Sequence, residues 1–463
     1  MTGLLAIATV GGVLDMGGGG AAPSLLNNKV WFDFSDATTL FTDAGRTTPV
    51  SSAGDAVWGL TDKGGSENHG TPSSTVKPIY YPSVKNGRSV LQFVNSNVVT
   101  PSLASFPSKR GAIFVVYKPR FSTAAFLAAT FNGFAPHWAL YSALSGGTKN
   151  LYYDGTQRTS AEYDVADTWY LKVFWRDGDT TAKHRRNKVA VDSLTVGNSQ
   201  PVANPLYVGN STVGSGMGKL IGEFLLFDDM TQAHMLAWED YLYNKWDIAS
   251  QNDTTPVTML AVGDSITAGT GASDAAHRWT NLVKAAGGYD VLYNNGVSGT
   301  VLQNTVQNTV AVIGGAVTSN LRDNRDTRIS YYSPDYLFIL YGLNDLRLND
   351  AAFTSALFQN DLQEIVQQAK AYGTPAAHIV IGSPPYIPAA SYTLAPPWDG
   401  ATAGKFTDYI AACAAVATAE GTKYIDVNAW MIANGGDTLI GPDGIHPNDA
   451  GHDAIADAFL SVL

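Results

Sequence analysis

Residues 257–269 read VTMLAVGDSITAG, and this stretch decides the fold class of the half of the chain that contains it. Its first six residues are almost uninterrupted apolar side chains and predict a short, fully buried strand. Strands buried on both faces are typical of parallel sheets covered by helices on each side. The turn Gly263-Asp264-Ser265 follows at once, so polar side chains are expected at the carboxyl end of this strand.

Apolar strand patterns of the same kind recur from here to the C-terminus, with helical patterns between them. Further apolar strands are predicted at 291–293, 336–341, 378–381 and 423–427, and helices at about 276–286, 353–372, 403–420 and from 449 onward. Strands that alternate with helices predict a parallel, doubly wound (flavodoxin-like) α/β sheet. Ligands of such sheets lie at the carboxyl ends of the strands, so chemistry is expected there.

Upstream the pattern is all-β. Short strands are predicted at 30–34, 89–94, 112–116, 169–175, 189–191, 206–208 and 221–227, with turn pairs such as Asn86-Gly87 and Asp154-Gly155 between them. This spacing suits an antiparallel two-sheet sandwich, which residues 231–246 are expected to close as an amphipathic helix. The predicted organisation is therefore a glycine-rich arm (1–26), a β-sandwich (27–250), a polar linker (251–256) and the α/β domain (257–463).

Charge differs between the two halves of the 463-residue chain. Residues 1–250 carry 20 basic and 20 acidic side chains, whereas residues 251–463 carry 9 and 20. An acidic half is repelled by phosphate backbones, so no nucleic-acid partner is expected. No stretch approaches the length of a membrane span. The single cysteine, Cys413, excludes an intrachain disulfide and is expected to be a buried apolar residue.

Ser265 is a candidate nucleophile, because a serine at a strand's carboxyl end can attack a carbonyl if a base, an orienting acid and oxyanion donors surround it. Near the C-terminus, GPDGIHP (441–447) could supply the acid as Asp443 and the base as His446. The backbone N–H of Gly299 and the side-chain amide of Asn344 follow two other predicted strands and could stabilise an oxyanion.

Four blocks carry a resemblance to a known family: GDSI (263–266), NNGVSGT (294–300), GLND (342–345) and DGIHP (443–447). In this order they resemble the signature of the SGNH/GDSL hydrolases over residues 257–463. The resemblance implies that Ser265 is the nucleophile, His446 the base and Asp443 its orienting acid. It further implies that the N–H groups of Ser265 and Gly299 and the Asn344 side chain form the oxyanion hole, and that no metal or cofactor takes part.

Each of these residues also has a commoner structural role. Ser265 could cap a helix, and Asn344 and Asp443 could be turn residues; the conjunction of the four blocks favours catalysis. Asp264 and Asp345 are expected to hold loops through backbone hydrogen bonds. His452 on the final helix is expected to be exposed or capping, and His277 is interpreted in the same way.

The N-terminal half resembles, more loosely, concanavalin/laminin-G-like jelly rolls. The similarity lies in VWFDFSD (30–36), NGRSVLQF (86–93), GEFLLF (222–227) and the closing helix. Such folds often bind sugars on aromatic side chains, but core packing is the expected role of the aromatics in this half: Trp58, Trp138, Tyr152, Tyr153, Trp169 and Trp175. The basic run 183–188 is expected to be a solvated loop or hairpin.

A jelly roll joined to an SGNH hydrolase, with a glycine-rich arm, is similar to bacteriophage tail and baseplate proteins. We therefore predict a virion-associated or extracellular serine esterase that acts on acyl groups, foremost O-acetyl groups, of a cell-surface polysaccharide. The arm is interpreted either as a flexible or extended segment or as a segment that docks an assembly partner, and a homo-oligomer is left open. The alternatives are a small-molecule lipase, thioesterase or arylesterase, and a structural or receptor-binding virion protein with a hydrolase fold as scaffold.

Overall fold

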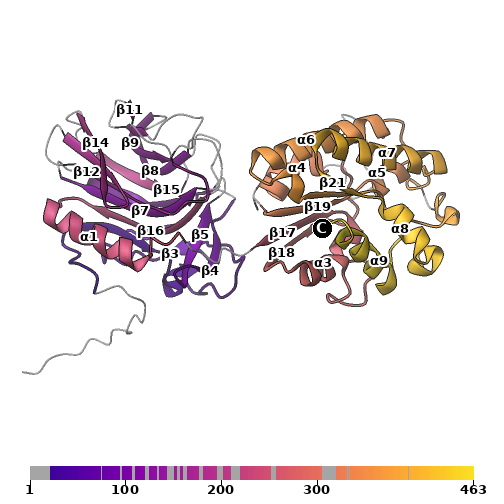
Figure 1. Ribbon diagram of the computed structural model, residues 1–463, viewed down its shortest axis with the longest axis horizontal. Coiled ribbons are helices and arrows are strands. Elements are labelled where there is room, and N and C mark those ends of the chain that lie inside the picture. Colours follow the sequence, from indigo (N-terminus) through magenta and orange to yellow (C-terminus); the bar gives the residue numbers. More distant parts are fainter. Residues whose placement is uncertain are drawn as a thin grey trace, which may run out of the picture.

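The computed structural model describes residues 21–463 except 74–75, 94–95, 107–109, 120–124, 133–134, 143–150, 154–156, 160–163, 177–180, 196–201, 210–218, 252–256, 305–319, 331, 333 and 395. Figure 1 shows two bodies that follow one another along the chain, a β-rich one and an α/β one. The predicted arm up to residue 20 and the predicted linker from residue 252 to 256 lie outside the described residues.

Two antiparallel sheets build the N-terminal body. The larger has the order β14-β13-β12-β7-β16-β5-β4, with β1 paired to β16, and the smaller has the order β11-β10-β9-β8-β15-β6. The larger sheet consists of β1 (Asn28–Asp33), β4 (Ile79–Lys85), β5 (Arg88–Phe93), β7 (Ala112–Pro119), β12 (Tyr170–Arg176), β13 (Thr181–Arg186), β14 (Val189–Thr195) and β16 (Lys219–Phe227). The smaller consists of β6 (Val98–Phe106), β8 (Ala125–Asn132), β9 (Ala135–Ser142), β10 (Leu151–Tyr153), β11 (Gln157–Thr159) and β15 (Val202–Val208), and β2 (Leu40–Phe41) pairs with β3 (Gly59–Leu60) apart from both. The predicted β-rich half is thus present, and its jelly-roll identity stays a prediction.

Both faces of the larger sheet are buried at its central strands, β7, β12 and β16. Phe224 belongs to one apolar cluster and its neighbour Leu225 to the other, as the two-residue period of a strand requires. Helix α1 (Gln232–Lys245) lies on this sheet (Figure 1). It contributes the buried side chains of Trp238 and Leu242 to the second cluster. This helix begins where the Thr231 side chain accepts a hydrogen bond from a backbone N–H, and it confirms the predicted closing helix.

The aromatic side chains divide in their roles. Trp169 and Trp175 are buried, as expected. Trp58 is 44% exposed, so its expected core role is wrong, and the ammonium of Lys77 lies 4.3 Å from its ring centroid. The side chains of Trp138, Tyr152 and Tyr153 lie outside the described residues.

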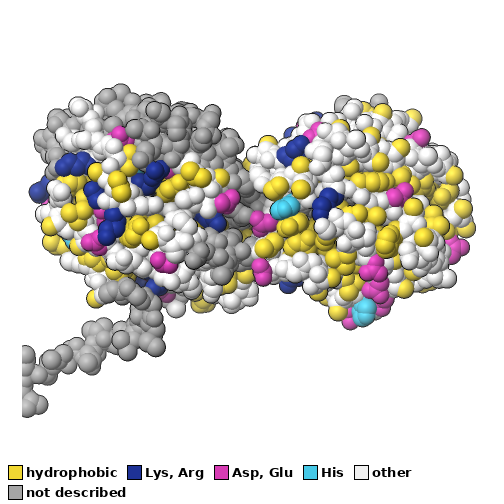
Figure 2. All heavy atoms as spheres, viewed as in Figure 1, with side chains coloured by type: hydrophobic (Ala, Val, Ile, Leu, Met, Phe, Trp, Pro, Cys, Tyr) yellow, Lys and Arg dark blue, Asp and Glu magenta, His cyan; other side chains and the backbone are white. Residues whose placement is uncertain are grey.

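The basic run 183–188 forms the β13–β14 hairpin, as one of its two interpretations had it. It is only partly solvated, because His184 is buried and Arg185 donates two hydrogen bonds to the carboxylate of Glu239 on α1. On the face drawn in Figure 2, Lys and Arg side chains gather over this body and are sparser on the α/β body.

The α/β body contains a five-stranded parallel sheet of order β18-β17-β19-β20-β21. This is the flavodoxin-like order, with the first strand beside the middle of the sheet. The strands are β17 (Thr258–Gly263), β18 (Val291–Gly296), β19 (Tyr336–Leu340), β20 (Ile379–Gly382) and β21 (Lys423–Ile425). Helices α3 (Trp279–Gly287) and α9 (Asp449–Leu460) cover one face, and α6 (Ser355–Ala371) and α7 (Ala403–Glu420) the other (Figure 1).

Among its described residues this body also has the shorter α-helices α2 (Ser265–Ala268), α4 (Leu321–Arg325), α5 (Leu343–Arg347) and α8 (Val427–Ala433). Gly263 pairs with Gly296 and with Leu340, so the carboxyl ends of three strands meet at one edge. Cys413 on α7 is buried, as predicted. In the described part of the chain no helix is both long and apolar enough to cross a membrane.

The two bodies touch through the edge strand β18. The hydroxyl groups of Tyr81 and Tyr293 lie 2.7 Å apart. Val291 belongs to the second apolar cluster, which lies between α1 and the larger sheet. Tyr293 and Val291 both lie in the first half of β18, away from its carboxyl end, where the loops that carry polar residues begin.

Candidate active site

Ser265 is placed by the turn between β17 and α2. The Asp264 side chain accepts a hydrogen bond from the backbone N–H of Ile266 at 3.0 Å and so caps the helix that Ser265 begins. The helix lies tightly against β18, because a Cβ on Gly296 would lie 2.1 Å from the backbone nitrogen of Ala268. Only glycine allows this approach, and it fixes Ser265 over the strand ends.

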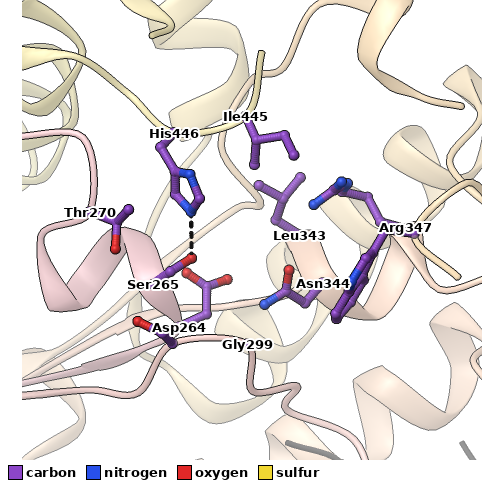
Figure 3. A pocket seen from close by; sticks show the side chains of 11 residues that line it. Asp264, Ser265, Thr270, Gly299, Leu343, Asn344, Arg347, Ile445 and His446 are labelled. Atoms are coloured by element: carbon purple, nitrogen blue, oxygen red, sulfur yellow. Dashed lines mark hydrogen bonds between the residues drawn. The ribbon is translucent and has the colours of Figure 1, made fainter. Parts of the chain in front are cut away.

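A hydrogen-bonded relay leads from Ser265 to the C-terminal loop. His446 Nε2 lies 2.9 Å from Ser265 Oγ (Figure 3). On the other side of the ring, His446 Nδ1 lies 2.6 Å from Asp443 Oδ2. The other Asp443 oxygen accepts the backbone N–H groups of Ile445 and His446, each at 2.9 Å. A backbone hydrogen bond of 2.8 Å from Gly441 to His446 closes the loop. The structure thus brings together the three residues predicted as nucleophile, base and acid.

The carboxyl groups near the relay differ in charge state. Partial burial opposes ionisation of Asp443, but the hydrogen bonds from His446 and two backbone N–H groups lower its pKa below the ordinary value. Burial raises the pKa of Asp264 to about 6 and that of Asp345 to about 7. Of these three carboxyl groups, Asp443 is therefore the one that hydrogen bonds hold ionised beside the imidazole.

The two predicted oxyanion donors flank Ser265. Asn344 donates one hydrogen bond from Nδ2 to the carbonyl of Thr300 at 2.9 Å, which fixes the amide and leaves its second N–H for a ligand. Gly299, with a φ of 76°, occupies the left-handed region that favours glycine. Both residues line the same cavity as Ser265.

Asp345 ties two of these loops together. Its carboxylate accepts the backbone N–H groups of Leu302 at 3.0 Å and Gln303 at 2.9 Å. The expectation that Asp264 and Asp345 hold loops through backbone hydrogen bonds is confirmed.

A cavity of about 440 Å³ opens at this edge. It is lined by Asp264, Ser265, Thr270, Ser298, Gly299, Leu343, Asn344, Arg347, Trp398, Ile445 and His446 (Figure 3). Asp443 is not part of the lining and reaches the cavity through His446. The sequence interpretation missed Arg347 and Trp398; Arg347 could have been found, because it follows Asn344 by three residues and shares its face of α5.

His452 corrects another expectation. It lies on α9 but is fully buried, with Nε2 3.2 Å from the Thr270 carbonyl and Nδ1 3.5 Å from the backbone nitrogen of Trp279. The reason is that the loop around Thr270 folds back over the final helix, where Ser273 also hydrogen-bonds Asp449. Burial lowers the pKa of His452, so it serves this packing as a neutral ring. His277 is exposed, as expected.

Arg328 holds the strand ends beneath the site. Its guanidinium donates to the carbonyl of Asn295 at 2.7 Å and to that of Gly263 at 3.3 Å. The guanidinium also lies 5.9 Å from the ring centroid of Tyr341. Among the residues that the structure describes, no group of three or more His, Cys, Asp or Glu side chains could hold a metal ion.

Residues 261–454 match the family model of the GDSL-like Lipase/Acylhydrolase family. Three solved structures are similar over 44% of this chain. They are TesA (21% identity, TM-score 0.34, 97% of that chain covered), a lipase/acylhydrolase from Enterococcus faecalis (21%, 0.35, 94%) and an acetylxylan esterase from Geobacillus stearothermophilus (19%, 0.33, 93%). A search of the curated proteins found no match.

Proposed function

We propose that Ser265 cleaves O-acetyl esters of a polysaccharide, on the premise that the C-terminal half is a GDSL/SGNH hydrolase domain and the chain a carboxylic ester hydrolase. The observation that carries the proposal is the relay from Ser265 Oγ through His446 to Asp443 at the mouth of the cavity.

The relay performs acyl transfer in two steps. His446 Nε2 takes the Ser265 proton as Oγ attacks the ester carbonyl, and Asp443 holds the imidazolium that forms. The N–H groups of Ser265 and Gly299 and the Asn344 amide stabilise the oxyanion. The bond from carbon to the sugar oxygen then breaks, His446 returns its proton to that oxygen, and the acyl group stays on Ser265. Water, deprotonated by His446, attacks the acyl group and releases acetate, and Ser265 regains its proton.

The lining of the cavity supports a short acyl group on a polar alcohol. Most of its side chains are polar, and a buried guanidinium stands among them. A long acyl chain needs a continuous apolar groove to offset its transfer from water. Leu343, Ile445 and Trp398 give the cavity an apolar part that can accept a methyl group and one face of a sugar ring. We take the polar side chains and the guanidinium beside this part to favour an acetylated sugar over a lipid.

The setting of the enzyme is proposed from its organisation. We propose that the β-sandwich and the arm attach the hydrolase to a phage particle, where it would meet the polysaccharide of a host surface. Attachment is tested by expressing residues 27–463 in place of the full chain during particle assembly; particles that carry the shortened protein at the normal level would refute a docking role of the arm.

The experiment that tests the activity is the release of acetate by the full chain from a panel of O-acetylated polysaccharides, followed by mass spectrometry. Ser265→Ala is the matched control, because it removes one oxygen atom and leaves the cavity otherwise intact. We expect acetate release from at least one acetylated polysaccharide by the native chain and none by S265A. Equal release by both would contradict the assignment of Ser265, and release from p-nitrophenyl acetate alone would favour the small-molecule esterase.

A further inference from the structure

Arg347 lines the active-site cavity without a role in the acyl-transfer relay. It ends α5 three residues after Asn344, and only 4% of its surface is exposed. Figure 3 shows its guanidinium reaching from α5 into the cavity that Ser265 and His446 also line. A positive charge is thus held in the wall of the substrate site.

This guanidinium has no hydrogen-bond or ion-pair partner among the described residues. Its Nε is buried and makes no hydrogen bond, and no described carboxylate forms an ion pair with it. Burial lowers the pKa of Arg347, and the charges of Asp264 and Asp443 oppose this lowering. Both of those carboxylates are engaged elsewhere, in the helix cap and in the relay. A buried charge without a hydrogen-bonded counter-charge is costly, and the cost is relieved when a ligand supplies one.

The surroundings keep the guanidinium in place. The Trp398 ring centroid lies 5.6 Å from it, in the range of a cation–π contact. The loop that carries Trp398 is fixed to the end of α5 by two backbone hydrogen bonds, from Gly400 to the Arg347 carbonyl at 2.8 Å and from Asn349 to the Pro397 carbonyl at 2.9 Å. The site is therefore organised before any substrate binds.

We propose that Arg347 is a specificity-determining residue that binds a carboxylate of the substrate, so that the acyl ester to be cleaved lies on, or next to, an acidic sugar residue. The proposal rests on the proposed esterase function and names its substrate class. A guanidinium offers five N–H donors in a plane and no acceptor, and a carboxylate accepts two of them in parallel. A sugar hydroxyl could accept only one and would leave the charge unbalanced.

The separation between Arg347 and the oxyanion donor Asn344 suits a single sugar ring that contacts both. Side chains three residues apart on a helix begin about 5–6 Å from each other. A ring held by Arg347 at its carboxylate can therefore present an acylated hydroxyl to Asn344 and Ser265. Binding at Arg347 would orient the ester for attack.

The test uses the native full chain with a matched pair of substrates, an O-acetylated methyl glucuronoside and the same glycoside with its carboxylate converted to a carboxamide. The pair differs by one charge and has nearly the same shape. Because hydrogen bonds to charged groups are the strong ones, we expect kcat/KM to be about 10- to 100-fold higher for the acid. In Arg347→Gln the ratio should fall to near one, and in Arg347→Lys it should be intermediate because the charge remains without the planar fork.

Arg322→Gln is the control, since Arg322 lies on α4 in ion pairs with Asp361 and Glu364 and loses the same charge outside the cavity. It should keep the native ratio. Equal kcat/KM for acid and amide with the native chain would overturn the inference, and so would an unchanged ratio in R347Q; the native pair decides even if R347Q does not fold. If the native chain hydrolysed neither of the two glycosides nor p-nitrophenyl acetate, the esterase proposal itself would be overturned.

Discussion

Ser265 and Asn344 contact the same cavity, but they would act at different moments of the reaction. Ser265 carries the covalent step, whereas the Asn344 amide meets the oxygen only once it becomes an oxyanion. Removal of one such donor costs about 10²–10³ in kcat. We therefore expect Asn344→Ala to lower kcat by this factor with little change in KM, and Ser265→Ala or His446→Ala to lower it about 10³–10⁶-fold. Steady-state kinetics with p-nitrophenyl acetate measures both.

Asn344 also fixes Thr300 through its amide, so a loss of activity could have a structural origin. The free energy of unfolding of N344A, measured by urea denaturation, is therefore the control: a near-native value together with a reduced kcat assigns the loss to the oxyanion donor. A raised KM with unchanged kcat in N344A would mean that the amide binds substrate and transition state equally, and the oxyanion role would be wrong.

Asp264 gives a prediction about stability and pH. Burial raises its pKa from 3.8 to about 6 in the folded chain, which corresponds to about 3 kcal/mol. A raised pKa means that the folded state favours the protonated form, so this contribution is present below about pH 4 and is lost as the pH rises through about 6. Asp264→Asn keeps a capping side chain but cannot ionise. We compare the free energies of unfolding of D264N and of the native chain, measured by urea denaturation. The value for D264N minus the native value should therefore rise by up to about 3 kcal/mol from pH 4 to pH 8.

The exposed Asp457 on α9 provides the control, because D457N removes the same charge from the surface of the same domain. D457N should run parallel to the native chain across this range. A constant difference between D264N and the native chain at both pH values would show that Asp264 ionises as freely in the folded state as in the unfolded state.

The role of a residue could be predicted where the neighbouring sequence forms a recognisable motif. It could not be predicted where the role depends on contacts with segments far away in the chain. The four blocks indicated Ser265, Asp443 and His446, which the fold brings within hydrogen-bonding distance. The burial of His452 depends on a loop more than 170 residues earlier, which no local pattern reports. The position of Arg347 in the cavity likewise depends on Trp398 covering the end of α5.

At the scale of elements, the contact between α2 and β18 controls where Ser265 stands. A methyl group on Gly296 would meet the backbone of α2 at 2.1 Å, and backbone cannot rotate away as a side chain can. Gly296→Ala should destabilise the chain by about 1–3 kcal/mol. Because a displacement of about 1 Å can cost about 10²-fold in rate, kcat for p-nitrophenyl acetate should also fall by one to two orders of magnitude.

Gly404→Ala is the matched control for this change. Gly404 lies in the first turn of α7, where an added Cβ would have no atom nearer than 3.8 Å. It should leave kcat unchanged and should stabilise the helix slightly. Native kcat in folded G296A would show that α2 can shift without moving Ser265 out of reach of His446.

The elements of the two halves differed in how well they could be predicted. Strands such as β17 and β19 are continuous apolar runs buried on both faces, and their predicted bounds agree with the structure to within one residue. In the β-rich half no strand was predicted at β2, β3, β4, β6 or β8 to β11, and β13 was expected only as part of a loop or hairpin. β6 contains Pro101 and two serines and β13 carries four basic side chains, so these two strands lack the apolar signal by which strands were recognised. Their pairing comes from neighbouring strands of the sheets.

At the scale of the whole molecule, the question is whether the two bodies cooperate. Every residue of the relay and of the cavity lining lies within residues 264–446. The two bodies touch elsewhere, where Tyr81 meets Tyr293 of β18 and Val291 of the same strand packs on the larger sheet. We therefore expect residues 253–463, expressed alone, to fold and to hydrolyse p-nitrophenyl acetate with kcat/KM within about threefold of the full chain, since no catalytic group is lost.

The same pair of proteins separates chemistry from substrate capture. If the β-sandwich only carries the hydrolase, the isolated domain should also match the full chain on an acetylated polymer. If the sandwich binds the polymer, it raises the concentration of ester groups at the site, and the isolated domain should lose rate on the polymer while it keeps its rate on p-nitrophenyl acetate. Residues 253–463 with Ser265→Ala set the background in both assays. An isolated domain that folds, by circular dichroism, but is inactive on the small ester would show that the sandwich completes the active site, and the independence of the α/β domain would be refuted.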